Sequence, residues 1–383
     1  MLSRREWLEG IVGVAAAGLT ATEMIKPSAL EKHLIPTAKA RAQAFFGIYR
    51  AQRGIVIAEV YRRQESEGRS RDFEEAVEWG EAMIKRLPNG VFDFPVPRNI
   101  GTDLYDLHFD SPLVVAAFKE DLDVLKRYQQ LGPGALTIKT IMPEDRKGNP
   151  RPRWQELPDG SLNALGLPGH GIEKRIPEID ASGIIDPNKP IIISIGGNSI
   201  DDYIKVFDHL RNHYQGFSNI IYEINISCPN TQEGQNMIKH PELLDELLAY
   251  MRPSTNAIMG VKLSPDMSNT ETSRFVELVQ KYARTYINIG NTSFKRCEEV
   301  GLAPNCTSIG GGGYSGDKLY QISLERTETV AKTGIPFIAT GGVRTSERAK
   351  RLLDKGATLV GAATIVGENP FFIPLTNYYL AGY

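Results

Sequence analysis

Eight short apolar segments recur in the C-terminal part of the chain, and a helical stretch follows each of them. They are "LVVAAF" (from residue 113), "ALTIKT" (135), "IIISIGG" (191), "IIYEINIS" (220), "IMGVKLS" (258), "YINIGNT" (286), "PFIATGG" (336) and "LVGAAT" (359). Continuous apolar strands that alternate with helices are typical of a parallel sheet covered on both faces. Eight such units over about 270 residues predict a closed (β/α)8 TIM barrel. An open doubly wound sheet is the alternative, but the G-x-G-x-x-G turn expected after its first strand is absent.

The residues before these repeats predict a helical extension behind a leader. Helical periodicity runs from 38 to 87, and the prolines and glycine of 88–99 mark a boundary. At the start, Arg4 and Arg5 precede a Gly/Ala-rich run that is too short to span a bilayer. This pattern resembles a twin-arginine export signal; a leader that never leaves the cytoplasm is the alternative. We expect a leader or membrane-proximal segment at 1–40, a helical extension at 41–100 and the barrel at 101–383.

Charge and cysteine content exclude several classes of protein. A formal net charge of -2 argues against a nucleic-acid partner, because phosphate binding needs a concentrated Lys/Arg surface. Cys228, Cys297 and Cys306 have no C-x-x-C spacing, which removes a zinc site or an iron–sulfur cluster held by this chain alone. Their odd number argues against a disulfide framework and makes a reducing, cytoplasmic compartment the default.

Polar residues gather where the predicted strands end, which is the face that carries the chemistry of such barrels. They include Lys139, Thr140, Asn198, Asn225, Lys262 and Asn291. A lysine inside an apolar strand, as in "GVKLSPD", needs an anion unless its head reaches solvent. Because a reduced flavin carries negative charge, Lys262 fits a flavin stabiliser.

A Gly-Gly turn and a closing strand in residues 339–364 predict a phosphate site. The loops after strands seven and eight of such barrels commonly bind phosphate through backbone N–H groups. Gly342, Ala363 and Thr364 fall in these loops. A plain turn with a glycine cap is the alternative.

The segment "YEINISCPNT" (222–231) combines an apolar strand with a polar end. Alternation puts Asn225 and Ser227 on the inward face, and Cys228 follows in a turn fixed by Pro229. A thiol acts as a base only when its neighbours favour the thiolate, and a buried inert cysteine is the alternative. Asn225 and Asn230 are suited to binding a planar amide or carboxylate, which favours a catalytic Cys228.

Several of these segments together closely resemble the dihydroorotate dehydrogenases, FMN-dependent (β/α)8-barrel enzymes of pyrimidine synthesis. They are "INISCPNT", "VKLSPD", "NTS" (291–293), "GGGYSG" (311–316), "ATGGVRT", "IKTIMPEDRKGNPRPR" (138–153) and "LNALGLPGHG" (162–171). The resemblance runs from about 107 to 370 and implies oxidation of (S)-dihydroorotate to orotate. Cys228 would take the C5 proton while hydride passes from C6 to flavin N5, and Lys139 would bridge substrate and flavin.

The same resemblance implies the binding residues. Those that would hold orotate are Lys139, Asn163, Leu165, Gly166, Leu167, Asn225, Asn230, Asn291 and Thr292. Those that would contact FMN are Ala116, Ala117, Thr140, Asn198, Asn225, Lys262, Gly316, Gly342, Ala363 and Thr364. Three residues depart from the family pattern, namely Phe118 after the paired alanines, Gly169 in place of an asparagine and Ala363 in place of a glycine. No metal is implied.

The resemblance leaves the electron acceptor open. Cys228 and Lys139 are similar to the soluble class 1 enzymes, whereas "AAFKED" (116–121) and the helical extension are similar to the membrane-linked, quinone-using class 2 enzymes. Fumarate, a quinone and NAD reached through a partner are therefore the alternatives, with a homodimer as one assembly. A flavin enzyme acting on a neutral dihydropyrimidine ring and a non-catalytic, exported flavin-binding barrel are the competing functions.

Overall fold

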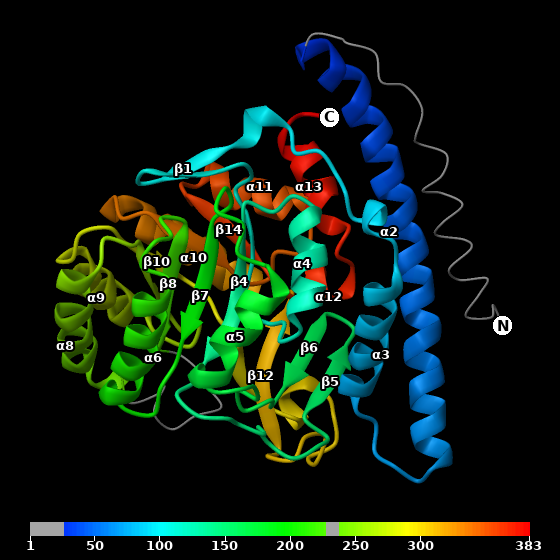
Figure 1. Ribbon diagram of the computed structural model, residues 1–383. Helices are drawn as coiled ribbons and strands as arrows, with labels where there is room; N and C mark the ends of the chain where they lie inside the picture. The colour runs from blue at the N-terminus through cyan, green and yellow to red at the C-terminus, as the bar shows by residue number, and fades with distance from the viewer. Residues whose placement is uncertain (1–26, 227–236) are drawn as a thin grey trace.

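The computed structural model describes residues 27–226 and 237–383, and within them eight parallel strands form a closed barrel (Figure 1). Each strand pairs with the next one along the chain, and the last pairs with the first. The barrel strands are β3 (Leu113–Val115), β4 (Ala135–Ile141), β7 (Ile191–Ile195), β8 (Ile220–Asn225), β9 (Met259–Lys262), β10 (Thr285–Asn288), β13 (Phe337–Thr340) and β14 (Leu359–Ala362). They coincide with the eight apolar segments, so the predicted TIM barrel is confirmed.

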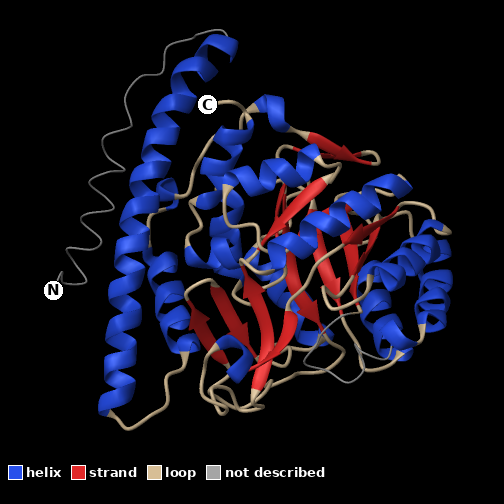
Figure 2. Cartoon of the chain, turned by 180° about the vertical axis from the view of Figure 1, so that it is seen from behind, coloured by secondary structure: helices blue, strands red, loops and turns tan. Residues whose placement is uncertain are grey.

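Helices cover the outside of the barrel, as Figure 2 shows from the opposite side. These are α4 (Leu122–Gln130), α5 (Ile172–Ser182), α6 (Ile200–His213), α8 (Pro241–Met251), α9 (Asn269–Gln280), α10 (Leu319–Val330) and α11 (Ser346–Asp354). Local sequence sets their ends. Ser268 and Glu271 form a capping box at the start of α9, and Gly183 ends α5 in a left-handed conformation with φ of 60°.

The barrel interior changes from apolar to polar along its axis. Ile192, Ile221 and Leu359 form an apolar cluster near the amino ends of their strands, and the hairpin of β1 (Thr102–Leu104) and β2 (Leu107–Phe109) packs against it. Next along the axis, Glu223 accepts hydrogen bonds from Tyr286 Oη at 3.0 Å and Asn288 Nδ2 at 2.9 Å. These bonds satisfy a buried carboxylate that would otherwise destabilise the core.

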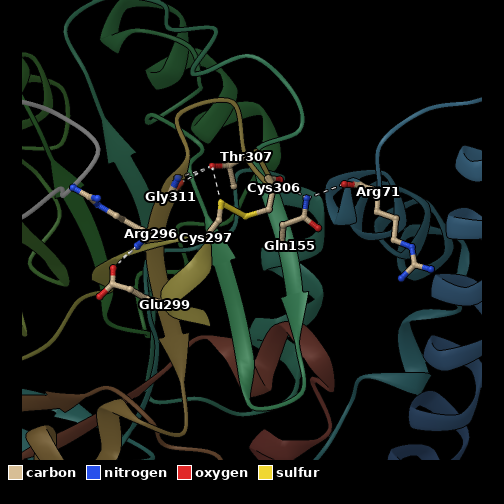
Figure 3. The surroundings of a disulfide bond; sticks show 8 residues. All are labelled: Arg71, Gln155, Arg296, Cys297, Glu299, Cys306, Thr307 and Gly311. Carbon is tan, nitrogen blue, oxygen red and sulfur yellow. Dashed lines mark hydrogen bonds between the residues drawn. A yellow bond between two sulfur atoms is a disulfide. The ribbon is translucent and has the colours of Figure 1, made fainter. Parts of the chain in front are cut away.

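A second, antiparallel sheet holds the long insertions between barrel strands. Its order is β11 (Ser293–Arg296), β12 (Gly311–Gly316), β6 (Gly160–Asn163) and β5 (Trp154–Leu157). Cys297 and Cys306 form a disulfide in the connection between β11 and β12 (Figure 3). The odd cysteine count, which argued against a disulfide framework, therefore does not exclude this single pair. An odd number of cysteines still allows one pair within the chain, so the reducing-compartment default loses the support of the cysteine count.

The helical extension consists of α2 (Pro27–Ser66) and α3 (Phe73–Arg86), which stand side by side along the barrel (Figure 1). α2 also packs on α13 (Phe372–Leu380), close to the short helix α12 (Thr364–Glu368). Phe45 stacks on Phe371 with 5.1 Å between ring centroids, and Asn369 Nδ2 donates to Phe46 O at 2.8 Å. The described part of α2, from Ile35 onward, and α13 therefore share one apolar core.

The expected boundary between residues 40 and 41 falls inside α2, and the three-region division stays a prediction. The twin-arginine-like residues Arg4 and Arg5 lie outside the described residues. Across residues 27–226 and 237–383, no helix combines the length and the apolar character needed to cross a membrane.

One buried arginine joins α10 to the ends of two barrel strands. Arg326 is 2% exposed, and its Nη1 donates to Ser264 O at 2.5 Å and Ile289 O at 3.3 Å. Its Nη2 donates to Pro265 O at 3.1 Å and also to Met267 O. The guanidinium thus satisfies four carbonyls of loops that follow β9 and β10.

We expect Arg326→Met to lower the free energy of unfolding by about 3–5 kcal/mol, because the buried carbonyls lose their donors. Urea denaturation followed by circular dichroism measures this change. Arg351→Met on the exposed side of α11 is the matched control and should change it by less than about 0.5 kcal/mol. Equal effects of the two substitutions would contradict the structural role of Arg326.

Candidate active site

A cavity lies over the carboxyl ends of the barrel strands. Barrel-strand ends, the antiparallel sheet and the helical extension all contribute to its wall. The predicted residues that line it are Ala116, Ala117, Lys139, Thr140, Asn163, Leu165, Leu167, Asn225, Lys262, Asn291, Thr292, Gly316, Gly342, Ala363 and Thr364. The structure therefore brings together residues that are separated by up to 248 positions, from 116 to 364.

Four predicted residues lie elsewhere or are not described. Gly166 is next to the lining residues Leu165 and Leu167 but does not itself line the cavity. Asn198 is exposed on the rim, where its Oδ1 accepts from Arg146 and its backbone N–H donates to Asp202. Cys228 and Asn230 lie outside the described residues. The ligand contacts assigned to these four residues, and to the residues that line the cavity, stay predictions.

A chain of hydrogen bonds fixes the amides at the floor of the cavity. Asn225 Nδ2 donates to Thr140 Oγ1 at 3.0 Å, and Asn291 Nδ2 donates to Asn225 Oδ1 at 3.3 Å. Thr140 Oγ1 also lies 3.0 Å from Ser194 Oγ. Tyr203 Oη holds the backbone of Asn225 by donating to its carbonyl at 2.8 Å. The Asn225 amide is thus oriented on both sides, as a preorganised binding group requires.

Two buried lysines supply positive charge to this floor. Lys139 Nζ donates to Pro168 O at 3.2 Å and lies 3.4 Å from Glu120 Oε2. Burial lowers the pKa of Lys139, while the charge of Glu120 opposes that effect. Lys262 is 5% exposed at the end of β9, in register with Asn225 of β8. Such a cavity favours an anionic ligand. Ammonium groups that have little contact with water are stabilised by a negative charge nearby.

The loop after β6 forms one side of the cavity and is held by backbone hydrogen bonds. Asn149 donates from its backbone N–H to Leu165 O at 3.0 Å and from Nδ2 to Ala164 O at 2.7 Å. Gly166 and Leu167 have φ of 74° and 55°, and the left-handed region is unusual for leucine. This conformation lets Leu165 and Leu167 both face the cavity.

The opposite side consists of small residues at the ends of β13 and β14. Gly341 and Gly342 have φ of 124° and 67°, and a Cβ on Gly342 would lie 2.3 Å from Tyr320 N. Only glycine fits this turn. The buried Thr340 Oγ1 at the same wall makes no hydrogen bond to the described residues. A hydroxyl without a hydrogen-bond partner, next to a turn whose glycines leave the backbone N–H groups accessible, fits a ligand that carries a phosphate.

The outer wall comes from residues that the sequence analysis did not include. Arg53, Phe73 and Val77 of the extension line the cavity together with Trp154, whose buried Nε1 makes no hydrogen bond to the described residues. Phe73 meets Trp154 edge-on at 5.6 Å between centroids. The helical periodicity of residues 38–87 predicted helices here, but it did not identify what they cover.

Two departures from the family pattern have a local explanation. A Cβ on Gly169 would lie 2.9 Å from Glu120 Oε1, so the glycine leaves room for the carboxylate that pairs with Lys139. Phe118 lines the cavity, and its ring would meet a Cβ on Gly367 at 3.1 Å. A larger residue at 118 is thus accommodated by a small one in α12.

Comparison with known proteins identifies the family. The family model described as dihydroorotate dehydrogenase matches residues 99–375. A curated relative from Geobacillus sp. (strain WCH70), the catalytic subunit of dihydroorotate dehydrogenase B (NAD(+)), is 29% identical over 282 residues, which cover 72% of this chain and 88% of the relative. The corresponding subunit from Listeria innocua is 27% identical over 283 residues, covering 72% and 90%.

Solved structures share the fold. The ligand-free dihydroorotate dehydrogenase of Eimeria tenella has a TM-score of 0.68 at 18% identity, covering 81% of this chain and 94% of that chain. The same enzyme in complex with ferulenol has a TM-score of 0.67 at 19% identity, covering 80% and 90%. Since the family model spans most of the barrel and its rim, this chain belongs to the dihydroorotate dehydrogenase family.

Proposed function

We propose that the protein oxidises (S)-dihydroorotate to orotate in de novo pyrimidine (UMP) biosynthesis, using FMN. The observation that carries this proposal is that one cavity holds both a buried cation, Lys139, and the oriented amides of Asn225 and Asn291. A carboxylate on the ligand would neutralise Lys139, and a planar ring with imide groups would match the amides. Membership of the family and the curated names of the relatives support the reaction.

The cavity fits FMN at its floor and its glycine-rich side. Lys262, Thr140 and Asn225 would hold the ring system, and the turn at Gly342 with Ala363 and Thr364 would hold the phosphate. When bound, the flavin would accept the hydride from C6 of the substrate. Lys262 at the end of β9 would lie near this ring, and its charge would stabilise the negative charge of a reduced flavin.

Cys228 would serve as the base that removes the C5 proton. It follows Asn225 by three positions, so the strand that places the amide also leads to the thiol. Lys139 would bind the substrate carboxylate and thereby orient C5 and C6. Asn163 and Thr292 would hold the ring from the side of the antiparallel sheet, and Leu165 and Leu167 would exclude water.

A second cavity favours an apolar electron acceptor such as a quinone. It lies between the extension and the barrel and is lined mainly by apolar residues, including Tyr49, Val56, Ile57, Ala76 and Ile84. Arg53, Phe73 and Val77 line both cavities, so the two adjoin. The relatives named for NAD(+) support the other candidate, a nicotinamide reached through a partner subunit.

We expect Cys228→Ser to slow anaerobic reduction of the bound flavin by dihydroorotate by about 10²-fold or more at neutral pH, because a serine hydroxyl loses its proton far less readily than a thiol and so supplies much less of the basic form. Stopped-flow absorbance of the flavin measures this rate. The flavin content of the variant serves as the control and should equal that of the wild type. Reduction at the wild-type rate would remove Cys228 from its assigned role.

Lys139→Met should weaken orotate binding by about 30-fold or more, because the carboxylate loses its cation. Binding of uracil, which has no carboxylate, should change little. In the wild type, orotate affinity should fall as the pH rises through the lowered pKa of Lys139, below the pH at which an ordinary lysine deprotonates. Flavin absorbance titrations from about pH 6 to about pH 9.5 measure both effects. Tighter binding of uracil than of orotate would favour the neutral-ring alternative.

Val77→Trp should slow reoxidation of the reduced enzyme by a soluble quinone by about tenfold, because the indole fills the junction of the two cavities. Reduction by dihydroorotate should keep its rate. Glu78→Trp, which adds the same group at an exposed position of α3, is the control. Reoxidation by fumarate or NAD(+) alone, with no response to quinone, would contradict the apolar acceptor.

A further inference from the structure

Three residues of the extension, Arg71, Phe73 and Glu74, contact residues 153–155 at the start of β5. Gln155 Nε2 donates to Arg71 O at 2.8 Å and to Cys306 O at 2.6 Å, which joins the extension to the disulfide-closed connection (Figure 3). Phe73 packs edge-on against Trp154. Residues 71–74 and 153–155 thus form a continuous junction between the extension and the antiparallel sheet.

The strongest contact of this junction is the ion pair of Glu74 and Arg153. Arg153 Nε donates to Glu74 Oε2 at 2.7 Å, and Nη2 donates to Oε1 at 2.8 Å. The two side chains are 13% and 12% exposed, so solvent screens the pair little. Burial raises the pKa of Glu74, but the hydrogen bonds and charges of Arg153 and Arg151 outweigh it and leave the pKa lowered.

The third nitrogen of the Arg153 guanidinium, Nη1, binds the 147–149 turn, which contacts the cavity loop 163–167. Nη1 donates to Lys147 O at 2.7 Å and to Asn149 O at 3.0 Å. Asn149 then donates to Leu165 O and Ala164 O, and Ala164 N donates to Arg153 O at 2.7 Å. Three successive hydrogen bonds, through Arg153 and Asn149, therefore connect Glu74 to the lining residue Leu165.

Only an arginine can make all these bonds at once. Its planar guanidinium offers five N–H donors, of which two bind the carboxylate while Nη1 binds two backbone carbonyls. Glu74 neutralises the charge and fixes the orientation of the plane. Glu74 is thus linked to the 147–149 turn through Arg153, although it does not itself line the cavity.

We propose that Glu74 and Arg153 are positioning residues that let the helical extension set the conformation of the 163–167 loop and so the affinity for the carboxylated ring substrate. The inference rests on the proposed function for the identity of the substrate. The extension would then contribute to substrate binding, independently of whether it also binds an electron acceptor in the second cavity.

The test compares Glu74→Ala with Glu75→Ala in the full chain with its flavin. Glu75 is a matched control, because it is 17% exposed and binds Gln64 and Arg69 within the extension alone. Glu74→Ala should raise KM for dihydroorotate and Kd for orotate by about tenfold with less than about threefold change in kcat. Glu75→Ala should lower stability without changing either constant. Glu74→Gln keeps one acceptor oxygen for Arg153 and should recover part of the affinity.

Hydrogen exchange of residues 147–167, measured without substrate, separates this inference from the proposed function. Exchange should be faster in Glu74→Ala than in the wild type and unchanged in Glu75→Ala. If the wild type fails to respond to dihydroorotate, the proposed function fails, and the exchange result still decides the positioning role. Equal rises of KM in both variants, or unchanged exchange in Glu74→Ala, would overturn the inference.

Discussion

Closure of a parallel barrel is the constraint on which the rest of the structure depends. Because all eight strands run in one direction, their carboxyl ends meet at a single rim. The interior is apolar at the other end, where a hairpin covers it, and becomes polar toward the rim through Glu223 and its two donors. Gly260 leaves space for the Tyr286 ring, one of the two groups that bind this buried carboxylate; a Cβ on Gly260 would lie 2.1 Å from that ring.

At the rim, charge and orientation come from different elements. The lysines at the ends of β4 and β9 supply the charge, and the hydrogen-bonded amides of β8 and the β10 loop supply fixed donors and acceptors. The sheet of β5, β6, β11 and β12 and the extension then enclose this floor. Enclosure matters because electrostatic attraction to an anion strengthens as water is excluded.

The sequence predicts the barrel and much of the floor, since both follow from local patterns. An apolar run marks a strand, and parallel pairing places the residues after each run at one rim. This explains why Lys139, Asn225 and Lys262 were predicted to lie together, as they do. Contacts between distant segments have no such local signal. The wall formed by Arg53 and its neighbours, and the Cys297–Cys306 pair, depend on how an extension and a long connection fold back, which periodicity and cysteine counts do not report.

The packing of α2 against α13 has a consequence for synthesis of the protein. Phe46 and Asn369, joined by a hydrogen bond, are 323 positions apart, so the ribosome makes the helix long before its partner. At translation rates of about 5–20 residues per second, that interval is roughly 16–65 s. Throughout it, the apolar side of α2 lacks the C-terminal part of its core. During that interval α3, which packs on α2 in the folded protein, is the partner already available to cover part of this side.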